Sequence, residues 1–375
     1  MRRRVGQGGR TAASGGIGDR GDQTSETREG CGIMQDRADA TNVLIVYPEE
    51  ADRMAGLVRE RFPDRVAEGS LRVFPVTDNK MVPQDMVEEI DIVLAFQLVF
   101  EVPRMKRLKW LQTLSSGIDH WEKSGLLSRE IPLVHVPGGS AIPIGEFVMG
   151  LMLNHVKRFD RIWENQKQMR FERFMGGELH GRTLAIVGLG GIGREVARLA
   201  KAFNMHVIGT ELVSTVPNVD EVYPPEAVDE IIARGDFVLL AVPETPETKG
   251  MMDERRFRLM KKTAYFLNCA RGSLVVKEAL LKALREGWIA GASIDTFWIK
   301  DPLPSYLPPG DELWTAPNVY LSPHISSWTD MYTPRFGAVF LENLDRWFRG
   351  LPLINVAPGY GPGPHQTNGP ELRAV

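Results

Sequence analysis

A glycine-rich turn between two apolar strings is the feature that most constrains the fold of this chain. The segment TLAIVGLGGIGREVARLAKAFNMHVIGTELV, from Thr183 to Val213, contains a Gly-x-Gly-x-x-Gly run. The apolar string LAIV directly precedes the glycines, and REVARLAKAF follows them with apolar residues at helical spacing. The pattern predicts a strand that turns sharply into a helix, which is the setting that a nucleotide-binding glycine motif requires.

The three glycines of this run have separate physical roles in such a turn. One permits the tight turn, one lets the backbone approach a pyrophosphate, and one lets the helix pack on the strand. The N-terminus of the helix adds partial positive charge that favours phosphate groups. Gly188, Gly190 and Gly193 are therefore predicted to bind a dinucleotide. A glycine-rich turn without a ligand is the alternative.

An acid at the end of the next apolar string indicates which dinucleotide is bound. Glu211 ends MHVIGTE, about 20 residues after the glycine run, where an acid can accept hydrogen bonds from the adenosine ribose. Its charge would repel the 2′-phosphate of NADP, and no Arg or Lys follows in LVSTVPN to offset it. NAD is therefore predicted as the cofactor. A solvated acid at a strand end is the alternative.

Short apolar strings alternate with longer amphipathic segments from Asn42 onward. VLIVY, LRVF, DIVLAF and WLQTL form a first series, and LAIVG, MHVIGT, DFVLLAV, AYFLN and IAGASID form a second. This alternation predicts parallel sheets covered by helices, and 375 residues suffice for two domains. A helical pattern over about 144–158 lies between the two series and is the candidate hinge, and RFGAVFLENLDRWFRG predicts a late amphipathic helix.

Composition and charge exclude several classes of function. The formal net charge is only −3, so neither a nucleic-acid nor a membrane partner is expected. No apolar run approaches the roughly 20 residues of a membrane-spanning helix. Cys31 and Cys269 lie far apart, without His or Cys neighbours at ligand spacing, so neither a disulfide framework nor a metal site is expected. These features fit a cytoplasmic protein.

The first residues differ in composition from the rest of the chain. MRRRVGQGGRTAASGGIGDRGDQTSETREG is rich in Gly, Arg and small polar residues, and it cannot bury a core. Residues 1–41 are therefore predicted to be a disordered extension, and a start misplaced upstream of Met34 would also explain them. An RNA-binding arm is a further alternative. No apolar segment typical of a secretory signal follows the arginines.

Several further motifs follow the glycine run in a fixed order. AVPETPETKGMMD, NCARGSLV, GASIDTF and NVYLSPHIS resemble those of the D-isomer-specific 2-hydroxyacid dehydrogenases, and the resemblance covers about Asn42 to Val356. It implies two doubly wound, parallel α/β domains, with a Rossmann NAD-binding domain inserted in a flavodoxin-like substrate domain. The implied substrate domain comprises 42–143 and 325–356, the NAD-binding domain 144–324, and a loose tail 357–375.

The activity that the resemblance implies is interconversion of a 2-oxo acid and a D-2-hydroxy acid. Hydride transfer needs a cation for the carboxylate and carbonyl, and an acid that protonates the oxygen formed. Arg271 in NCARG matches the cation, because its planar fork suits a carboxylate and keeps its charge. His324 in SPHIS matches the acid and base, because an imidazole titrates near neutral pH.

The family's third catalytic residue, a glutamate paired with the histidine, has no direct match. The segment DTFWIKDPLP, Asp295 to Pro304, carries an apparent one-residue insertion. Counting without a gap selects Lys300, a cation that would lower the pKa of His324. Anchoring on the Pro-Leu-Pro run and on the spacing to His324 selects Asp301, which is preferred because it retains a carboxylate.

The resemblance also implies further contacts with both ligands. Ser116 and Gly117 in TLSSGIDH match the loop whose backbone amides hold the substrate carboxylate, and Asp295 matches the acceptor for the nicotinamide carboxamide. Trp298 and Trp328 are candidates for the substrate pocket, with packing as the alternative. The remaining positions that match cofactor contacts are Gly191, Ile192, Val242, Pro243, Thr248, Cys269 and Ala270.

Two interpretations concern partners and rival functions. The family commonly forms dimers through its cofactor domains, and RFDRIWENQKQMRFERF is a candidate for the contact, with a plain linker helix as the alternative. The altered Asp295–Pro304 segment leaves open an NAD(H)-sensing protein similar to the family's corepressors. Oxidation of phosphite or formate is a further rival, which the carboxylate-holding loop disfavours.

Overall fold

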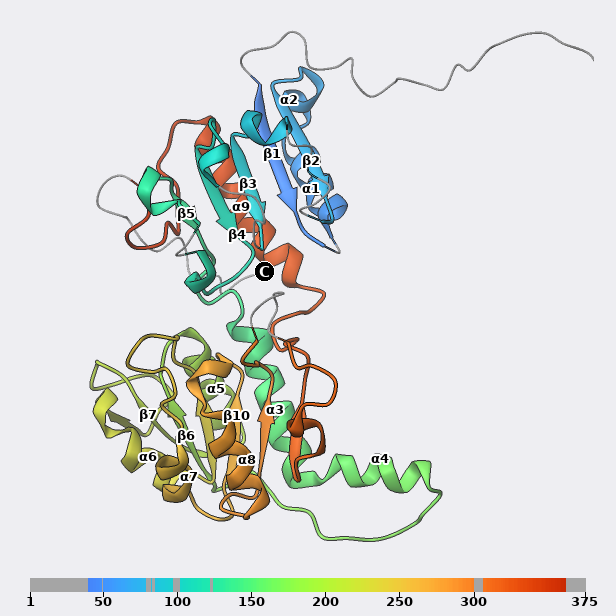
Figure 1. Ribbon diagram of the computed structural model, residues 1–375, viewed down its shortest axis with the longest axis vertical. Coiled ribbons are helices and arrows are strands. Elements are labelled where there is room, and N and C mark those ends of the chain that lie inside the picture. The colour runs from blue at the N-terminus through green and yellow to red at the C-terminus, as the bar shows by residue number, and fades with distance from the viewer. Residues whose placement is uncertain are drawn as a thin grey trace, which may run out of the picture. The chain divides into compact units, whose positions relative to one another are not determined.

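The computed structural model describes residues 40–48, 50–78, 82, 85–96, 102–121, 124–299 and 306–361. Most of the extension expected over 1–41 lies outside these residues, and the first strand already begins at Thr41. Within the described ranges the strands form two sheets, and all pairings between neighbours are parallel (Figure 1). The predicted α/β class with two parallel sheets is therefore confirmed. No helix in these ranges is long and apolar enough to cross a bilayer.

The first sheet has the strand order β2-β1-β3-β4-β5, the flavodoxin-like order. Its strands are nearly continuous apolar runs, as in IVLA of β3, because helices and loops cover both faces. The strands are β1 (Thr41–Val46), β2 (Leu71–Val76), β3 (Ile92–Ala95), β4 (Trp110–Thr113) and β5 (Leu133–Val134). The helical segments that accompany them are α1 (Ala51–Arg61), α2 (Pro63–Ala67), η2 (Met86–Glu89), η3 (Val102–Arg104), η4 (Asp119–Trp121) and η5 (Leu127–Arg129).

The last helix of the chain, α9 (Tyr332–Phe348), packs on the first sheet (Figure 1). Its buried face carries Phe336, Phe340 and Leu344, which share a core with residues of α1 and of strands β1 to β5. The ring of Phe340 lies 5.4 Å from that of Trp110 on β4. The chain therefore returns to the first sheet after completing the second.

The second sheet has the order β12-β11-β10-β9-β6-β7-β8. Strand order reverses between β6 and β9, as in dinucleotide-binding folds, and ligands bind outside the carboxyl ends of the strands at that point. The strands are β6 (Thr183–Val187), β7 (His206–Thr210), β8 (Glu221–Tyr223), β9 (Phe237–Leu240), β10 (Tyr265–Asn268), β11 (Gly291–Ile294) and β12 (Val319–Leu321). The helical segments are α3 (Ala141–Lys157), α4 (Phe159–Lys167), α5 (Gly191–Ala202), η6 (Pro225–Ala227), α6 (Val228–Arg234), α7 (Glu254–Leu259), η7 (Gly272–Leu274), α8 (Lys277–Arg285) and η8 (Glu312–Thr315).

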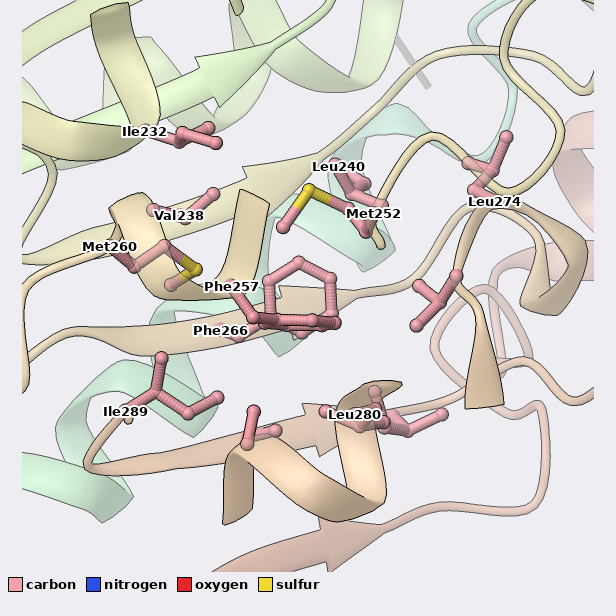
Figure 2. Packing of buried hydrophobic residues seen from close by; sticks show 14 of the residues in the cluster. Ile232, Val238, Leu240, Met252, Phe257, Met260, Phe266, Leu274, Leu280 and Ile289 are labelled. Carbon is pink, nitrogen blue, oxygen red and sulfur yellow. The ribbon is translucent and has the colours of Figure 1, made fainter. Parts of the chain in front are cut away.

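Side chains of the second sheet alternate between two cores, one on each face. Val238 and Leu240 of β9 face one cluster, and Phe237 and Leu239 face the other. Figure 2 shows part of the first cluster, where Phe266 of β10 packs with its ring centroid 5.2 Å from that of Phe257 on α7. Both faces are therefore filled, and the strand ends are the part of the sheet that remains for a ligand.

The candidate hinge helix is α3, which begins at Ala141, three residues before the expected start of 144. It ends where Arg158 adopts a left-handed backbone with φ of 54°. Ile144, Val148 and Met152 of α3 share a core with Val196 of α5. This helix therefore packs on the same face of the second sheet as the helix that follows the glycine run.

Part of the expected loose tail packs on the first sheet. Val356 bridges Val134, and the amide of Ala357 donates to the carbonyl oxygen of Leu133 at 2.7 Å. Ala357 and Tyr360 are buried in the core. The start of the expected tail thus packs on the first sheet, because β5 is an edge strand whose backbone groups accept another segment. Residues 362–375 lie outside the described residues.

Candidate active site

The glycine run has the geometry that its three predicted roles require. Gly188 has a φ of 98°, which side chains rarely adopt, so it makes the turn. A Cβ at Gly193 would lie 2.2 Å from the carbonyl oxygen of Gly188, so the helix needs glycine there to approach the strand. A Cβ at Gly190 would meet nothing within 4 Å. That open position leaves room for a pyrophosphate, and the glycine run therefore fits a dinucleotide.

The glycine loop lies where strand order reverses, among the ends of β6, β7 and β9. Thr210 holds the loop to β7, because its Oγ1 accepts from the Gly188 amide at 3.0 Å and its carbonyl oxygen accepts from the Leu189 amide at 3.0 Å. A Cβ built on Gly188 would lie 2.6 Å from Cγ1 of Val242, which follows β9. The structure thus brings Val242 to the glycine loop, and its expected contact on the adenine side of a cofactor stays a prediction.

The N-terminus of α5 faces the same place. Gly190 is the N-cap residue and has no side chain, so it makes no side-chain hydrogen bond to the first backbone amides. Such an end attracts anions through its amides and through the helix dipole. Gly191 begins the helix and lies close to the backbone of Gly138, where a Cβ would come within 3.3 Å. Ile192 packs partly against the core below.

Glu211 directly follows β7, and both of its carboxylate oxygens have neighbours. Its Oε1 accepts from the amide of Leu212 at 2.9 Å, and its Oε2 lies 4.0 Å from Nη2 of Arg194. Arg194 belongs to the first turn of α5, and its Nε donates to the carbonyl oxygen of Leu189 at 2.7 Å. No Arg or Lys follows Glu211 in LVSTVPN, but Arg194 precedes it in the sequence and approaches it from α5.

The loop after β9 is closed by Thr248. Its Oγ1 donates to the carbonyl oxygen of Pro243 at 2.8 Å and accepts from the amide of Thr245 at 2.8 Å. These bonds occupy the hydroxyl within the loop, so Thr248 fixes the path of Pro243 beside Val242. The expected contacts of Thr248 and Pro243 with a cofactor stay predictions.

Arg271 follows β10 on a loop held by a buried amide. The Asn268 side chain is fully buried, donates to the carbonyl oxygen of Arg271 at 2.8 Å and accepts from the amide of Ala270 at 3.1 Å. Arg271 itself is partly exposed, with Nη1 2.9 Å from the carbonyl oxygen of Ala270. Next to it, a Cβ on Gly272 would lie 2.3 Å from the backbone of Phe297. The Arg271 loop therefore packs directly on the loop after β11.

Cys269 lies between Asn268 and Arg271 and is buried in the core. Burial, with the charge of Asp295 as a smaller cause, raises the pKa of its thiol well above the usual value. The thiol is therefore neutral near pH 7 and behaves as a small apolar group. This agrees with Cys269 as a packing residue, whose backbone alone would face a cofactor.

His324 follows β12 on a tight turn with a left-handed backbone, φ 56°. Its amide donates to the carbonyl oxygen of Ser322 at 2.9 Å. The fully buried carboxylate of Asp295 accepts from Ser322 Oγ at 2.6 Å and from the amides of Ile325 and Ser326 at 3.1 Å each. Asp295 thus holds the chain on both sides of His324. Its expected contact with a carboxamide stays a prediction, and this positioning role was not foreseen.

The SSG loop after β4 has its side chains engaged within the protein. Oγ of Ser116 donates to the carbonyl oxygen of Val136 at 2.9 Å and lies 3.1 Å from Oγ of Ser140. Nδ1 of His135 lies 3.0 Å from the carbonyl oxygen of Ser116, and burial lowers the pKa of this histidine. The expected contact of the Ser116 and Gly117 backbone amides with a substrate carboxylate stays a prediction.

The two tryptophans near the motifs differ in their surroundings. Nε1 of Trp298 donates to the carbonyl oxygen of Val275 at 2.7 Å, and its ring packs on the core, which favours packing as its role. Trp328 is 37% exposed, and its ring lies 5.8 Å from Tyr47 and 4.9 Å from Tyr332. The Tyr332 hydroxyl donates to the carbonyl oxygen of Leu114, just before the SSG loop.

Asp301 and Lys300, the two candidates for the partner of His324, lie outside the described residues.

Comparisons with known proteins agree with this geometry. A model of the NAD-binding domain of D-isomer specific 2-hydroxyacid dehydrogenases matches residues 149–326. A glyoxylate reductase from Thermofilum pendens is 37% identical over 257 residues, which cover 65% of this chain and 73% of that protein. The chain belongs to this dehydrogenase family. A D-3-phosphoglycerate dehydrogenase from Methanocaldococcus jannaschii is 30% identical over 311 residues, but they span 82% of this chain and only 55% of that protein.

Solved structures of the family have the same fold. A family protein from Aeromonas salmonicida matches with a TM-score of 0.71 and 27% identity, over 85% of this chain and 99% of that one. A D-lactate dehydrogenase from Aquifex aeolicus, complexed with NAD and lactic acid, matches with a TM-score of 0.69 and 26% identity, over 83% and 96%. These relatives support NAD(P)-dependent 2-hydroxyacid dehydrogenase activity.

Proposed function

We propose that this chain is an NAD-dependent dehydrogenase that interconverts a 2-oxo acid and a D-2-hydroxy acid. The observation that carries the proposal is a chain of contacts across three neighbouring strand ends. The Arg271 loop after β10 packs on the loop after β11 through Gly272 and Phe297. Asp295 in that second loop holds the turn of His324 after β12. A cation and a titratable imidazole thus share the sheet edge that carries the glycine loop.

Each residue in this proposal has a defined chemical task. Bound NADH supplies the hydride, and the chain's own residues bind and polarise the acid. Arg271 pairs with the substrate carboxylate and stabilises negative charge as it develops on the carbonyl oxygen. His324 donates a proton to that oxygen during reduction and accepts it during oxidation. Asp301 is proposed as the carboxylate partner that raises the pKa of His324, rather than Lys300.

NAD is proposed over NADP because Glu211 occupies the position beyond β7 where the adenosine ribose is expected. A carboxylate there accepts hydrogen bonds from ribose hydroxyls and repels a 2′-phosphate. Of the family's structures, the one from Aquifex aeolicus contains NAD, and a reductase from Sinorhizobium meliloti that is 26% identical contains NADP. The choice therefore depends on the residues around Glu211 rather than on the fold.

The two sheets correspond to a proposed division of the chain into domains. Residues 42–143 and 325–356 would form the substrate domain, because α9 completes the core of the first sheet. Residues 144–324 would form the NAD-binding domain, because α3 shares a core with α5. Backbone amides of Ser116 and Gly117 would then hold the substrate carboxylate. The chain passes between the domains twice, which makes hinge closure possible.

A homodimer is proposed through α4 and the segment that follows it. Met169, Phe171 and Met175 in this segment are 94%, 102% and 96% exposed, and Trp163 of α4 is 62% exposed. Exposed apolar side chains gathered on one segment favour a protein contact. Analytical ultracentrifugation should show a dimer for the native chain and a monomer after Trp163→Asp and Phe171→Asp. A monomeric native chain would contradict this assembly.

The test of the proposed activity is reduction of a panel of 2-oxo acids, from glyoxylate to phenylpyruvate, with NADH. At least one acid should be reduced, and chiral analysis should identify a D-hydroxy acid where the product has a stereocentre. An L product would contradict the proposal. Tight NADH binding without turnover of any acid would favour the NAD(H)-sensing alternative.

A further inference from the structure

Arg194 lies where a nucleotide-specificity residue can act. It belongs to the first turn of α5, directly after the third glycine, and its side chain is 50% exposed. Its Nε donates to the carbonyl oxygen of Leu189 at 2.7 Å, which fixes the guanidinium over the glycine loop. Its Nη2 lies 4.0 Å from Oε2 of Glu211. The fork therefore approaches the one acid that the proposed function assigns to the adenosine ribose.

We infer that Arg194 is a second determinant of nucleotide choice, a cation that can bind the 2′-phosphate of NADPH and that Glu211 offsets. The inference rests on the proposed function, because it assumes that the ribose lies at Glu211. A phosphate on the 2′-oxygen of that ribose would enter the space beside the Glu211 carboxylate. The guanidinium borders the same space, and its fork matches phosphate oxygens better than a single ammonium does.

The contacts of Glu211 explain why it and Arg194 have opposite effects on NADPH binding. Its Oε1 is held by the amide of Leu212 at 2.9 Å, so the carboxylate stays beside the strand end. The separation of 4.0 Å from Arg194 is long for an ion pair, and solvent screens it. Arg194 therefore keeps donor capacity for a phosphate. The wild-type protein should bind NADPH weakly, and removal of the acid should expose the affinity of the arginine.

The test measures dissociation constants of NADH and NADPH for the full chain by calorimetry, without any need for turnover. The variants are Arg194→Gln, Glu211→Gln and the double variant, and Arg198→Gln is the matched control. Arg198 lies one turn further along α5, and its Nη2 pairs with Oε1 of Glu195 at 2.6 Å. Thermal melting of each variant checks that it folds.

Glu211→Gln should strengthen NADPH binding, and adding Arg194→Gln should then weaken it by about tenfold or more, the factor expected for one lost charge-assisted contact. NADH binding should change by less than about threefold on loss of Arg194. Adenosine 2′,5′-bisphosphate should show the same loss, whereas AMP should not. Arg198→Gln should change neither nucleotide.

Two results would overturn the inference. If loss of Arg194 weakened NADH and NADPH binding equally, Arg194 would lie at the shared pyrophosphate. If the double variant bound NADPH as tightly as Glu211→Gln does, Arg194 would not contact the nucleotide. In both cases NADH still binds, and the proposed function stands. Failure of the wild-type chain to bind either dinucleotide would contradict the proposed function and this inference together.

Discussion

Oδ1 of Asp295 lies 2.6 Å from Oγ of Ser322. A buried carboxylate after β11 therefore holds the residue that directly follows β12, two residues before His324. The same carboxylate accepts the amides of Ile325 and Ser326 on the other side of the histidine. His324 adopts a left-handed backbone, which is uncommon for a residue with a side chain. Asp295 therefore holds His324, the proposed acid and base, in this uncommon backbone conformation and fixes its position.

Replacement of Asp295 by Asn should lower kcat by more than the loss of folding stability alone would explain. The amide group cannot accept all three donors, and an unmatched buried polar group costs about 1–3 kcal/mol. The melting temperature should fall by several degrees, and kcat for 2-oxo acid reduction should fall by about tenfold or more. Ser322→Ala removes one donor but leaves both amide bonds, so it should have the smaller effect. Unchanged kcat in Asp295→Asn would show that the turn does not depend on this carboxylate.

Replacement of Gly272 by Ala should separate the Arg271 loop from the loop after β11. The added Cβ would lie 2.3 Å from the carbonyl carbon and oxygen of Phe297, which are backbone atoms and cannot move aside cheaply. We expect kcat/KM to fall by at least about tenfold, since misplacement of a catalytic group by about 1 Å is costly. Gly56→Ala on α1 is the matched control, because a Cβ there meets nothing within 4 Å. Normal kcat/KM in Gly272→Ala would contradict the contact.

Stability should fall between neutral pH and pH 5 because of His155. Burial, followed by the charges of Arg182 and Arg158, lowers the pKa of this histidine from 6.5 to about 4. Its ring stacks on Tyr265 at 4.0 Å. The unfolded chain binds a proton in this pH range before the folded chain does, so acid favours unfolding. Urea unfolding at pH 7 and pH 5 should show a larger loss for wild type than for His155→Gln. Equal losses of stability in the two proteins would show that groups other than His155 cause the pH dependence.

The pH dependence of reduction tests the proposed partner of His324. A carboxylate beside an imidazole raises its pKa, so the protonated acid should persist through neutral pH and reduction should fall only above the raised value. Asp301→Asn should move this fall to lower pH, and Lys300→Ala should not. A shift to higher pH in Lys300→Ala alone would assign the position facing His324 to the lysine.

Local sequence patterns predicted much of the cofactor region, because their physics is local. The separate roles of Gly188, Gly190 and Gly193 can be inferred from one strand-turn-helix, and the geometry of all three agrees with them. Contacts between strand ends could not be inferred in this way. Asp295 meets Ser322 only because β11 and β12 are neighbours in the sheet. Arg194 precedes Glu211 in sequence, and only the packing of α5 brings the two together.

The most direct test of the central claim is kcat/KM for NADH-driven reduction of the best 2-oxo acid, compared between wild type and Arg271→Ala. Arg61→Ala is the matched control, because Arg61 is exposed on α1. Loss of the cation that binds the carboxylate and stabilises the developing charge should lower kcat/KM by at least about a hundredfold, with the control unchanged. Equal turnover by wild type and Arg271→Ala would contradict the proposed site.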